Sequence, residues 1–323
     1  MGDNLFVHFY YTGGVIMEVS TNEIKELRER TSAGMMDCKK ALMENNSDME
    51  KAIEWLREKG LSKAAKKAGR IAAEGMVEVS ITDGIAAMVE VNSETDFVSK
   101  NENFRTYVKD VAEQVAKTQV NDTEDLLNQK WLKDQNKTVK DVLTEKISTI
   151  GENLSIRRFV KLNTTDGVVV PYIHGGGKIG VFVKLNTTNN SDAVIEAGKN
   201  IAMQVAAINP LYLSSGEIPA DYVESEKAIL REQALSEGKP AEIVEKMIAG
   251  RLNKQLQEVC LLEQNYVKDP EVTITKYLES VSKQVGTEVK VVSFVRFETG
   301  EGIQKKEENF ADEVAAQVES MKK

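Results

Sequence analysis

One pattern occurs twice after residue 75, and it limits the fold more than any other feature of the sequence. In each copy two alternating apolar segments flank a glycine-containing turn, which is typical of a β-hairpin. An amphipathic helix follows each hairpin, and a further β-like segment ends each copy. The predicted strands are 76–81, 85–92 and 156–162 in the first copy and 168–173, 179–186 and 291–297 in the second. We therefore expect an α+β fold of two related half-domains, each a small antiparallel sheet covered by helices.

The helices that follow the two hairpins share sequence as well as position. Val111-Ala-Glu-Gln-Val-Ala116 in the first copy corresponds to Ile201-Ala-Met-Gln-Val-Ala206 in the second. Each helix has an apolar stripe at helical spacing. The stripes are Phe104, Tyr107, Val108, Val111 and Val115 in the first helix and Val194, Gly198, Ile201, Ala202 and Val205 in the second.

The two copies differ in the connection between hairpin and helix. Nineteen positions separate Asn92 from Val111, whereas fifteen separate Asn186 from Ile201. The longer connection contains Thr95-Asp96-Phe97-Val98, a tight turn that presents a carboxylate beside an aromatic ring. Directly after it, Ser99 and Glu102 predict a capping box for the next helix.

Phe97 has two interpretations. Its ring can fold back into the core as a hydrophobic staple, or it can project and be buried by a partner. A staple that the fold requires would be expected in both copies, and the second copy has no equivalent of Asp-Phe-Val. The asymmetry favours a contact residue.

Before the repeat, the sequence predicts three short helices. Ser20 with Glu23 and Ser47 with Glu50 are capping boxes for the first and the third helix, and the third is expected to end at Gly60. A bundle of this size has a thin core, so it should be only marginally stable alone.

Met35 and Met36 begin the second of these helices, where methionine can simply fill the core. Adjacent residues point in different directions on a helix, so we expect one of the two to face outward as an adaptable contact. After the third helix, Lys63, Lys66, Lys67 and Arg70 lie broadly on one helical face. A solvated helical linker is the simpler interpretation of this stripe, and a ribosomal or acidic partner is the alternative.

Composition excludes several classes of function. A net charge of −9 argues against broad binding to phosphate backbones, so we expect neither DNA binding nor ribosome or RNA contact. Cys38 and Cys260 form no CxxC motif or disulfide framework, which indicates a reducing, cytoplasmic compartment. Two histidines exclude a histidine-rich metal site, and no apolar segment is long enough to span a membrane. No cofactor is expected.

An enzymatic function finds little support. Gly175-Gly-Gly177-Lys-Ile-Gly180 satisfies the G-x-G-x-x-G dinucleotide pattern, but residues 179–183 alternate as a strand where that motif must open a helix. Lys178 is followed by Ile, so the segment is no P-loop either. No G-x-S-x-G elbow occurs, and His174 is the only histidine after the first sixteen residues. We expect no covalent catalysis.

The ends of the chain and the segment 221–259 complete the sequence. Residues 1–16 contain neither Lys nor Arg, which fits neither a signal peptide nor a transit peptide, and we expect a poorly ordered or non-native leader. Residues 221–235 and 241–259 predict an antiparallel helical pair. A last amphipathic helix is predicted from Phe310, Val314 and Val318.

Several segments, in order and from Met17 to the C-terminus, resemble bacterial elongation factor Ts. They are Leu27-Arg-Glu-Arg-Thr-Ser-Ala-Gly-Met-Met-Asp-Cys-Lys-Lys-Ala-Leu42, Lys63-Ala-Ala-Lys-Lys-Ala68, Glu90-Val-Asn-Ser-Glu-Thr-Asp-Phe-Val98, Gly151-Glu-Asn-Leu-Ser-Ile-Arg-Arg158, His174-Gly175, Gly238-Lys-Pro240 and Arg296-Phe-Glu-Thr-Gly-Glu-Gly302. The sequence departs from the family mainly in the leader and in Gly176-Gly177.

The resemblance implies a guanine-nucleotide exchange factor for the GTPase elongation factor Tu. Such a factor binds the GDP complex, dislodges Mg²⁺, weakens nucleotide binding and promotes exchange of GDP for GTP. The residues that it assigns to partner binding and Mg²⁺ displacement are Thr95, Asp96, Phe97 and Val98. The secondary partner contacts that it assigns are Arg28, Met35, Met36 and His174. The alternative is a scaffold or holding factor that binds elongation factor Tu without altering its nucleotide.

The residue patterns and the resemblance together predict a division of the chain. The expected parts are the leader at 1–16, a three-helix ubiquitin-associated-like module at 17–59, a basic helical linker at 60–74, half-domain N at 75–166, half-domain C at 167–300 with a helical hairpin inserted at 219–260, and a C-terminal helix at 301–323.

Overall fold

The computed structural model describes residues 19–304 except 32, 188 and 238–240. The leader and the apolar stripe of the last predicted helix lie outside this range. The chain forms two compact units, one from residues up to Gly69 together with Asp141–Glu152, and the other from Arg70–Lys140 and from Asn153 onward. None of the helices in the described ranges is long and apolar enough to cross a membrane.

The first unit contains the three predicted N-terminal helices, α1 (Thr21–Thr31), α2 (Met35–Glu44) and α3 (Met49–Lys67). Their shared core is small and consists of Leu27, Cys38, Ala41, Leu42 and Ala52. The capping box of α1 is confirmed. The Ser20 amide donates to Glu23 Oε2 at 2.7 Å, and the Glu23 amide donates to Ser20 Oγ at 3.2 Å.

The third helix differs from its prediction at both ends. Asp48, not Ser47, caps α3, because the Lys51 amide donates to Asp48 Oδ1 at 3.1 Å. The helix also continues through Gly60 to Lys67. Gly60 is buried, and a Cβ at this position would lie 3.9 Å from Thr144 and Ser148 of α7 (Val139–Ile150). The glycine therefore serves close helix packing and does not end the helix.

The second unit contains two three-stranded antiparallel sheets, and all six predicted strands are confirmed to within two residues. The first sheet has the order β1-β2-β5 and the second the order β10-β7-β6. The strands are β1 (Glu74–Thr82), β2 (Ile85–Ser93), β5 (Ser155–Asn163), β6 (Val168–His174), β7 (Ile179–Asn186) and β10 (Lys290–Glu298).

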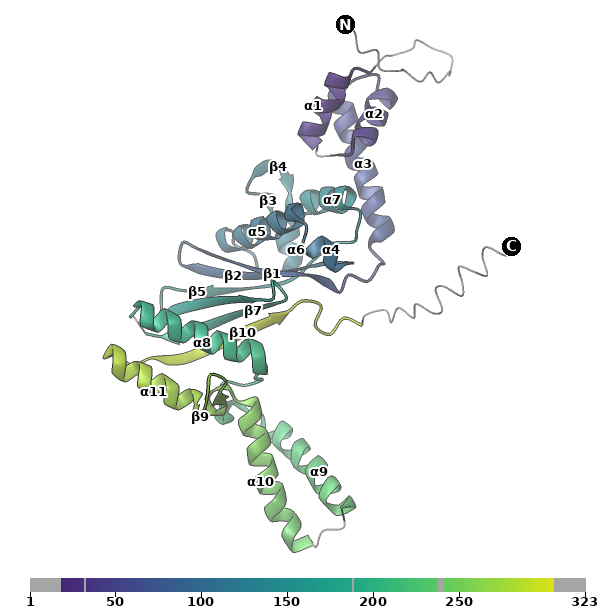
Figure 1. Cartoon of the computed structure of the whole chain (residues 1–323). Coiled ribbons are helices and arrows are strands. Elements are labelled where there is room, and N and C mark those ends of the chain that lie inside the picture. Colours follow the sequence, from purple (N-terminus) through teal and green to yellow (C-terminus); the bar gives the residue numbers. More distant parts are fainter. Residues whose placement is uncertain (1–18, 32, 188, 238–240, 305–323) are drawn as a thin grey trace. The chain divides into compact units, whose positions relative to one another are not determined.

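The sheets face each other, and helices cover their outer faces (Figure 1). Val77, Met88, Phe182 and Phe297 belong to the apolar cluster between the sheets. On the outer faces, α5 (Glu102–Lys117) packs on β1 and β2, and α8 (Asp192–Ile208) packs on β6 and β7. The predicted stripes of both helices are buried. The α+β fold with two related half-domains follows from these layers.

The repeat extends further than the sequence analysis predicted. After α5 and the short α6 (Thr123–Asn128), a small hairpin of β3 (Lys130–Trp131) and β4 (Asp134–Thr138) precedes α7. In the second copy, β8 (Asn265–Tyr266) and β9 (Asp269–Thr273) likewise precede α11 (Ile274–Val285). Equivalent buried glutamines hold the two hairpins. Gln114 bonds to Lys130 O and the Leu132 amide, and Gln204 bonds to Asn265 O and the Val267 amide.

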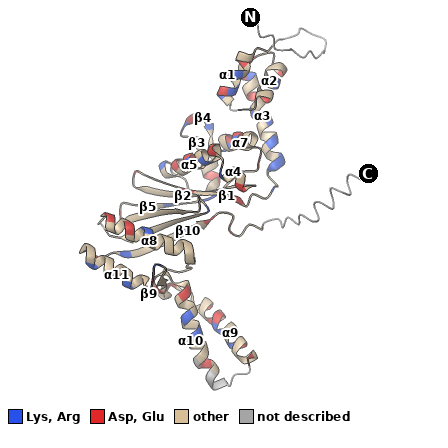
Figure 2. Ribbon diagram, viewed as in Figure 1, with Lys and Arg blue, Asp and Glu red and all other residues tan. Residues whose placement is uncertain are grey.

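The predicted helical pair is present as α9 (Ala220–Ser236) and α10 (Ala241–Val259), between the short 3-10 helices η1 (Ser215–Glu217) and η2 (Leu261–Glu263). Ala234, Val244 and Ile248 form its apolar contact. Both helices carry acidic and basic residues, as Figure 2 shows, and Arg231 pairs with Glu245 across them at 2.8 Å.

Candidate partner-binding site

The turn after β2 is a short helix, α4 (Asp96–Ser99), with Thr95 as its N-cap. Ser99 does not cap the following helix as predicted. It ends α4, where its hydroxyl donates to Asp96 O at 2.7 Å. Asn101 caps α5 instead, because its Oδ1 accepts from the Asn103 amide at 2.9 Å. The added helical turn explains why the first connection is longer than the second.

Phe97 points away from the unit that carries it. The residue is 79% exposed, whereas its neighbour Val98 is only 8% exposed. Val98 thus anchors α4, and the staple interpretation of Phe97 is wrong. An exposed phenylalanine on a one-turn helix fits a contact residue, but the exposure does not identify what it contacts, and the partner remains a prediction.

Asp96, beside this ring, has a defined geometry. Its Oδ2 accepts from Lys100 Nζ at 2.7 Å, one helical turn further on. The Lys100 ammonium holds the pKa of Asp96 below its usual range, and the charge of Lys178 acts in the same direction. Asp96 is therefore ionised at neutral pH and is still partly exposed to a partner.

His174 lies at the end of β6, in the same unit as α4. It is exposed, and its Nδ1 lies 3.0 Å from the Tyr172 hydroxyl. The turn that follows it reaches the start of α5, because Arg105 Nη1 donates to Gly176 O at 3.1 Å. The Arg105–Gly176 bond and the effect of the Lys178 charge on Asp96 both show that the β6–β7 turn lies close to α4. Sequence reasoning missed Arg105 and Lys178, since no local pattern links them to Phe97.

The glycine-rich turn between β6 and β7 joins the two sheets. Gly177 O accepts from the Val77 amide of β1 at 2.7 Å and from Thr299 Oγ1 at 3.0 Å. Gly177 has φ +110°, and a Cβ there would lie 2.8 Å from Met76 Cβ. Strand β7 follows this turn directly, so the predicted strand at 179–186 is confirmed, where a dinucleotide or P-loop motif would open a helix.

The remaining predicted contacts, Arg28, Met35 and Met36, are all exposed on the first unit. One of the two methionines was expected to face outward, and both do, because Met35 is 55% and Met36 is 74% exposed. The core of α2 begins only at Cys38, one turn later.

Asp37, next to these methionines, fixes α2 to α3. Its two oxygens accept from Lys59 Nζ at 2.7 Å and from Lys63 Nζ at 2.8 Å. Lys59 and Lys63 hold the pKa of Asp37 below its usual range. Lys63 of the basic stripe therefore has a structural role, which weakens the interpretation of the stripe as a free binding surface.

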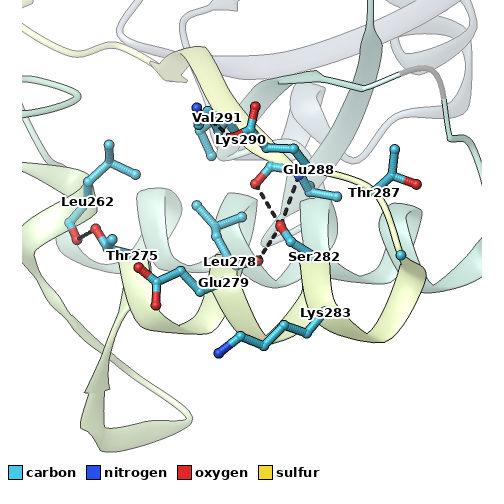
Figure 3. A pocket seen from close by; sticks show the side chains of 12 residues that line it. Leu262, Thr275, Leu278, Glu279, Ser282, Lys283, Thr287, Glu288, Lys290 and Val291 are labelled. Carbon is cyan, nitrogen blue, oxygen red and sulfur yellow. Dashed lines mark hydrogen bonds and ion pairs between the residues drawn. The ribbon is translucent and has the colours of Figure 1, made fainter.

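A cavity of about 680 Å³ lies elsewhere in the second unit, between α11 and the start of β10 (Figure 3). Leu278, Val289 and Val291 form its apolar part, and Ser282 Oγ accepts from the Val289 amide at 2.9 Å. Lys290 at its rim pairs with Glu288. The hydroxyls of this lining donate to backbone carbonyls, Ser282 to Leu278 O at 2.8 Å and Thr275 to Leu262 O at 2.7 Å. Within the described part of the chain, no three His, Cys, Asp or Glu side chains are placed to hold a metal ion.

Comparison with known proteins gives a consistent result. The family profile described as Elongation factor TS matches residues 94–301. Elongation factor Ts of Clostridioides difficile (strain 630) is 55% identical over 302 residues, which cover 93% of this chain and 99% of that protein. The same factor of Clostridium novyi (strain NT) is 53% identical with the same coverage, and that of Clostridium perfringens (strain SM101 / Type A) is 54% identical over 299 residues, 92% of this chain and 98% of that protein. The chain therefore belongs to the elongation factor Ts family of translation elongation factors.

Proposed function

We propose that this chain binds elongation factor Tu in its GDP-bound form and accelerates the exchange of GDP for GTP without covalent catalysis. The observation that carries the proposal is the exposed ring of Phe97, held on α4 beside the ionised Asp96. Thr95 and Val98 support this turn, as its N-cap and its buried anchor.

The proposed mechanism acts on the metal-bound phosphates of the partner. P-loop GTPases hold their nucleotide with backbone amides, a lysine and a Mg²⁺ ion that bridges phosphate oxygens. A ring inserted between partner elements near the metal displaces the groups that hold Mg²⁺, and the nucleotide is then bound less tightly. By linkage, a factor that weakens GDP binding is itself bound more weakly in the presence of GDP.

Burial of the Phe97 ring alone supplies too little free energy to shift the partner to its weakly nucleotide-binding state. Burial of a phenylalanine side chain stabilises a complex by about 1.5–3 kcal/mol. Reversal of a strongly biased two-state equilibrium needs about 5.5 kcal/mol of differential binding. We therefore propose that Arg28, Met35, Met36 and His174 contribute further contacts with the same partner.

The alternative function is a scaffold that holds elongation factor Tu and leaves its nucleotide unchanged. The exposed ring favours exchange, because a holding surface does not need a rigid projection. With either function we expect a cytoplasmic protein without DNA, membrane, ribosome or RNA contact and without a cofactor of its own.

Stopped-flow release of a fluorescent GDP analogue from elongation factor Tu separates the two functions. The unmodified chain is expected to accelerate release, and Phe97→Ala is expected to lose most of this effect while its circular dichroism stays unchanged. The matched control is Ile81→Ala, which removes an exposed apolar side chain (46% exposed) from the same unit. Unchanged release with Phe97→Ala would remove the ring from the mechanism, and no acceleration by the unmodified chain would favour the scaffold.

A further inference from the structure

Glu90 of β2 is a carboxylate with no exposed surface. Four donors surround it: Arg158 Nε at 2.6 Å, the Gly300 amide at 2.8 Å, Arg157 Nη1 at 3.0 Å and Asn92 Nδ2 at 3.1 Å. A buried charge is tolerated only when it is paired and hydrogen-bonded. Burial alone would raise the pKa of Glu90, but the Gly300 amide and the two arginines outweigh it and hold the pKa below its usual range.

This Glu90 cluster joins both half-domains. Arg157 and Arg158 belong to β5, whereas Gly300 lies in the turn after β10. Arg158 Nη2 also donates to Glu298 O and to Glu301 Oε2, each at 3.2 Å. The guanidinium of Arg158 lies 4.3 Å from the centre of the Phe297 ring.

Gly300 is needed where it lies. Its φ is +73°, and a Cβ there would lie 2.0 Å from Ala73 O, which only glycine avoids. The turn after β10 can therefore approach the first sheet closely enough for its amide to reach Glu90. Three segments far apart in the sequence thus meet at one buried carboxylate.

The cluster lies directly before the proposed contact turn. Glu94, four residues after Glu90, accepts from the Asn153 amide at 2.5 Å, and Thr95 then caps α4. The end of β2 is thereby held at Glu90 and, just after the strand, at Glu94. A partner that binds Phe97 would therefore contact a turn whose preceding strand, β2, is fixed to both β5 and the turn after β10.

The second half-domain provides an internal comparison. Lys184 of β7 occupies the position of Glu90, since both lie two residues before the matching Asn92 and Asn186. Lys184 pairs with Asp166 at 2.8 Å, and the Asp166 side chain is 65% exposed and lies just before β6. Among the described residues between β7 and α8, which exclude residue 188, no helical turn corresponds to α4. The buried cluster therefore occurs in the copy that carries the exposed ring.

We propose that Glu90 is a positioning residue, which fixes the end of β2 so that α4 holds Phe97 rigidly against the partner. This inference rests on the proposed exchange function. It adds that the cluster of Glu90, Arg157, Arg158 and Gly300 determines the efficiency of exchange, although none of these groups is part of the contact turn.

Glu90→Gln tests the inference, with Lys184→Gln as the matched control at the equivalent strand position. In Glu90→Gln, the accelerated release of a fluorescent GDP analogue at saturating factor is expected to slow about tenfold or more, as small misplacements of acting groups do. Lys184→Gln is expected to stay within about twofold of the unmodified chain, as changes at a distant, uncoupled pair do. Hydrogen exchange by NMR provides a readout without the partner. The Lys100 and Asn101 amides, which donate to Phe97 O and Val98 O, should exchange faster in Glu90→Gln and unchanged in Lys184→Gln.

Arg158→Lys replaces Glu90→Gln if that variant does not fold, because lysine keeps the charge but cannot bond at once to Glu90, Glu298 O and Glu301 as the guanidinium does. Slower GDP release and faster amide hydrogen exchange at Lys100 and Asn101 are then expected, both to a smaller degree than in Glu90→Gln. If the folded variants released GDP and exchanged their amide hydrogens at wild-type rates, the inference would be overturned. The proposed nucleotide-exchange function would be unaffected by that result. If the unmodified chain itself did not accelerate GDP release, the proposed nucleotide-exchange function would be wrong. Amide hydrogen exchange at Lys100 and Asn101 would then decide alone whether Glu90 positions the turn.

Discussion

Replacement of Gln114 by methionine should destabilise the second unit substantially. Gln114 is fully buried, and its side chain pairs with Lys130 O at 2.9 Å and with the Leu132 amide at 2.8 Å. Methionine has a similar volume but leaves both backbone groups of the β3 hairpin without that partner. Lys130 and Leu132 are exposed residues, so water can replace part of each lost bond. At about 0.5–1.5 kcal/mol for each hydrogen bond, the free energy of unfolding should fall by about 1–3 kcal/mol.

Trp131 provides a local assay for this loss. It is buried beside Tyr107, with 6.2 Å between ring centroids, and it belongs to the hairpin that Gln114 holds. In a Trp55→Phe background, urea unfolding followed by tryptophan fluorescence reports on this part of the chain. Gln204→Met, at the equivalent position of the second copy, should cost at least as much, because Gln204 also donates to Gln264 Oε1. Losses below about 1 kcal/mol in both variants would refute the role of these glutamines as hairpin anchors.

Two other predictions concern buried polar groups. The hydroxyl of Tyr107 is buried and has no hydrogen-bond partner within the described residues, so Tyr107→Phe should leave the free energy of unfolding unchanged or raise it by about 1–3 kcal/mol; a clear loss in urea unfolding would point to a hidden partner. The folded-state pKa of Glu90 lies below its ordinary value of 4.5, so its contribution to stability is present above that pH and is lost as the pH falls through the folded-state pKa. Unfolding midpoints measured at decreasing pH below 4.5 should therefore fall less steeply in Glu90→Gln than in the unmodified chain, and parallel curves would contradict this assignment.

The strands and the main helices could be predicted because their patterns are local. Alternation and turn glycines defined both hairpins, and the two stripes on α5 and α8 followed from spacing alone. Helix ends were less predictable. Ser99 and Asn101 are both good caps, and the choice between them depends on the extra turn of α4. Gly60 resembles a stop signal, but packing against Thr144 and Ser148 determines its role.

The second part of the repeat was visible in the sequence and was missed. Gln129-Lys-Trp-Leu-Lys-Asp134 corresponds to Gln264-Asn-Tyr-Val-Lys-Asp269, and each segment forms the small hairpin that a buried glutamine holds. The strands there are too short for an alternation pattern. A search for internal repeats beyond the first helix would have found them.

The candidate site was predictable only in part. The asymmetry between the copies indicated that Phe97 is exposed, since an alignment of the two halves needs no tertiary information. The Glu90 cluster was not predictable in this way. Glu90 and Gly300 are 210 residues apart, and only the packing of the two half-domains brings them together.

The central claim is that binding of this chain and binding of GDP to elongation factor Tu oppose each other. The most direct measurement is a titration of elongation factor Tu with the chain, in the absence of nucleotide and at saturating GDP, by isothermal calorimetry. The account predicts that GDP weakens the binding of the chain by the same factor by which the chain weakens the binding of GDP. Equal affinity for the nucleotide-free and the GDP-bound partner would contradict it.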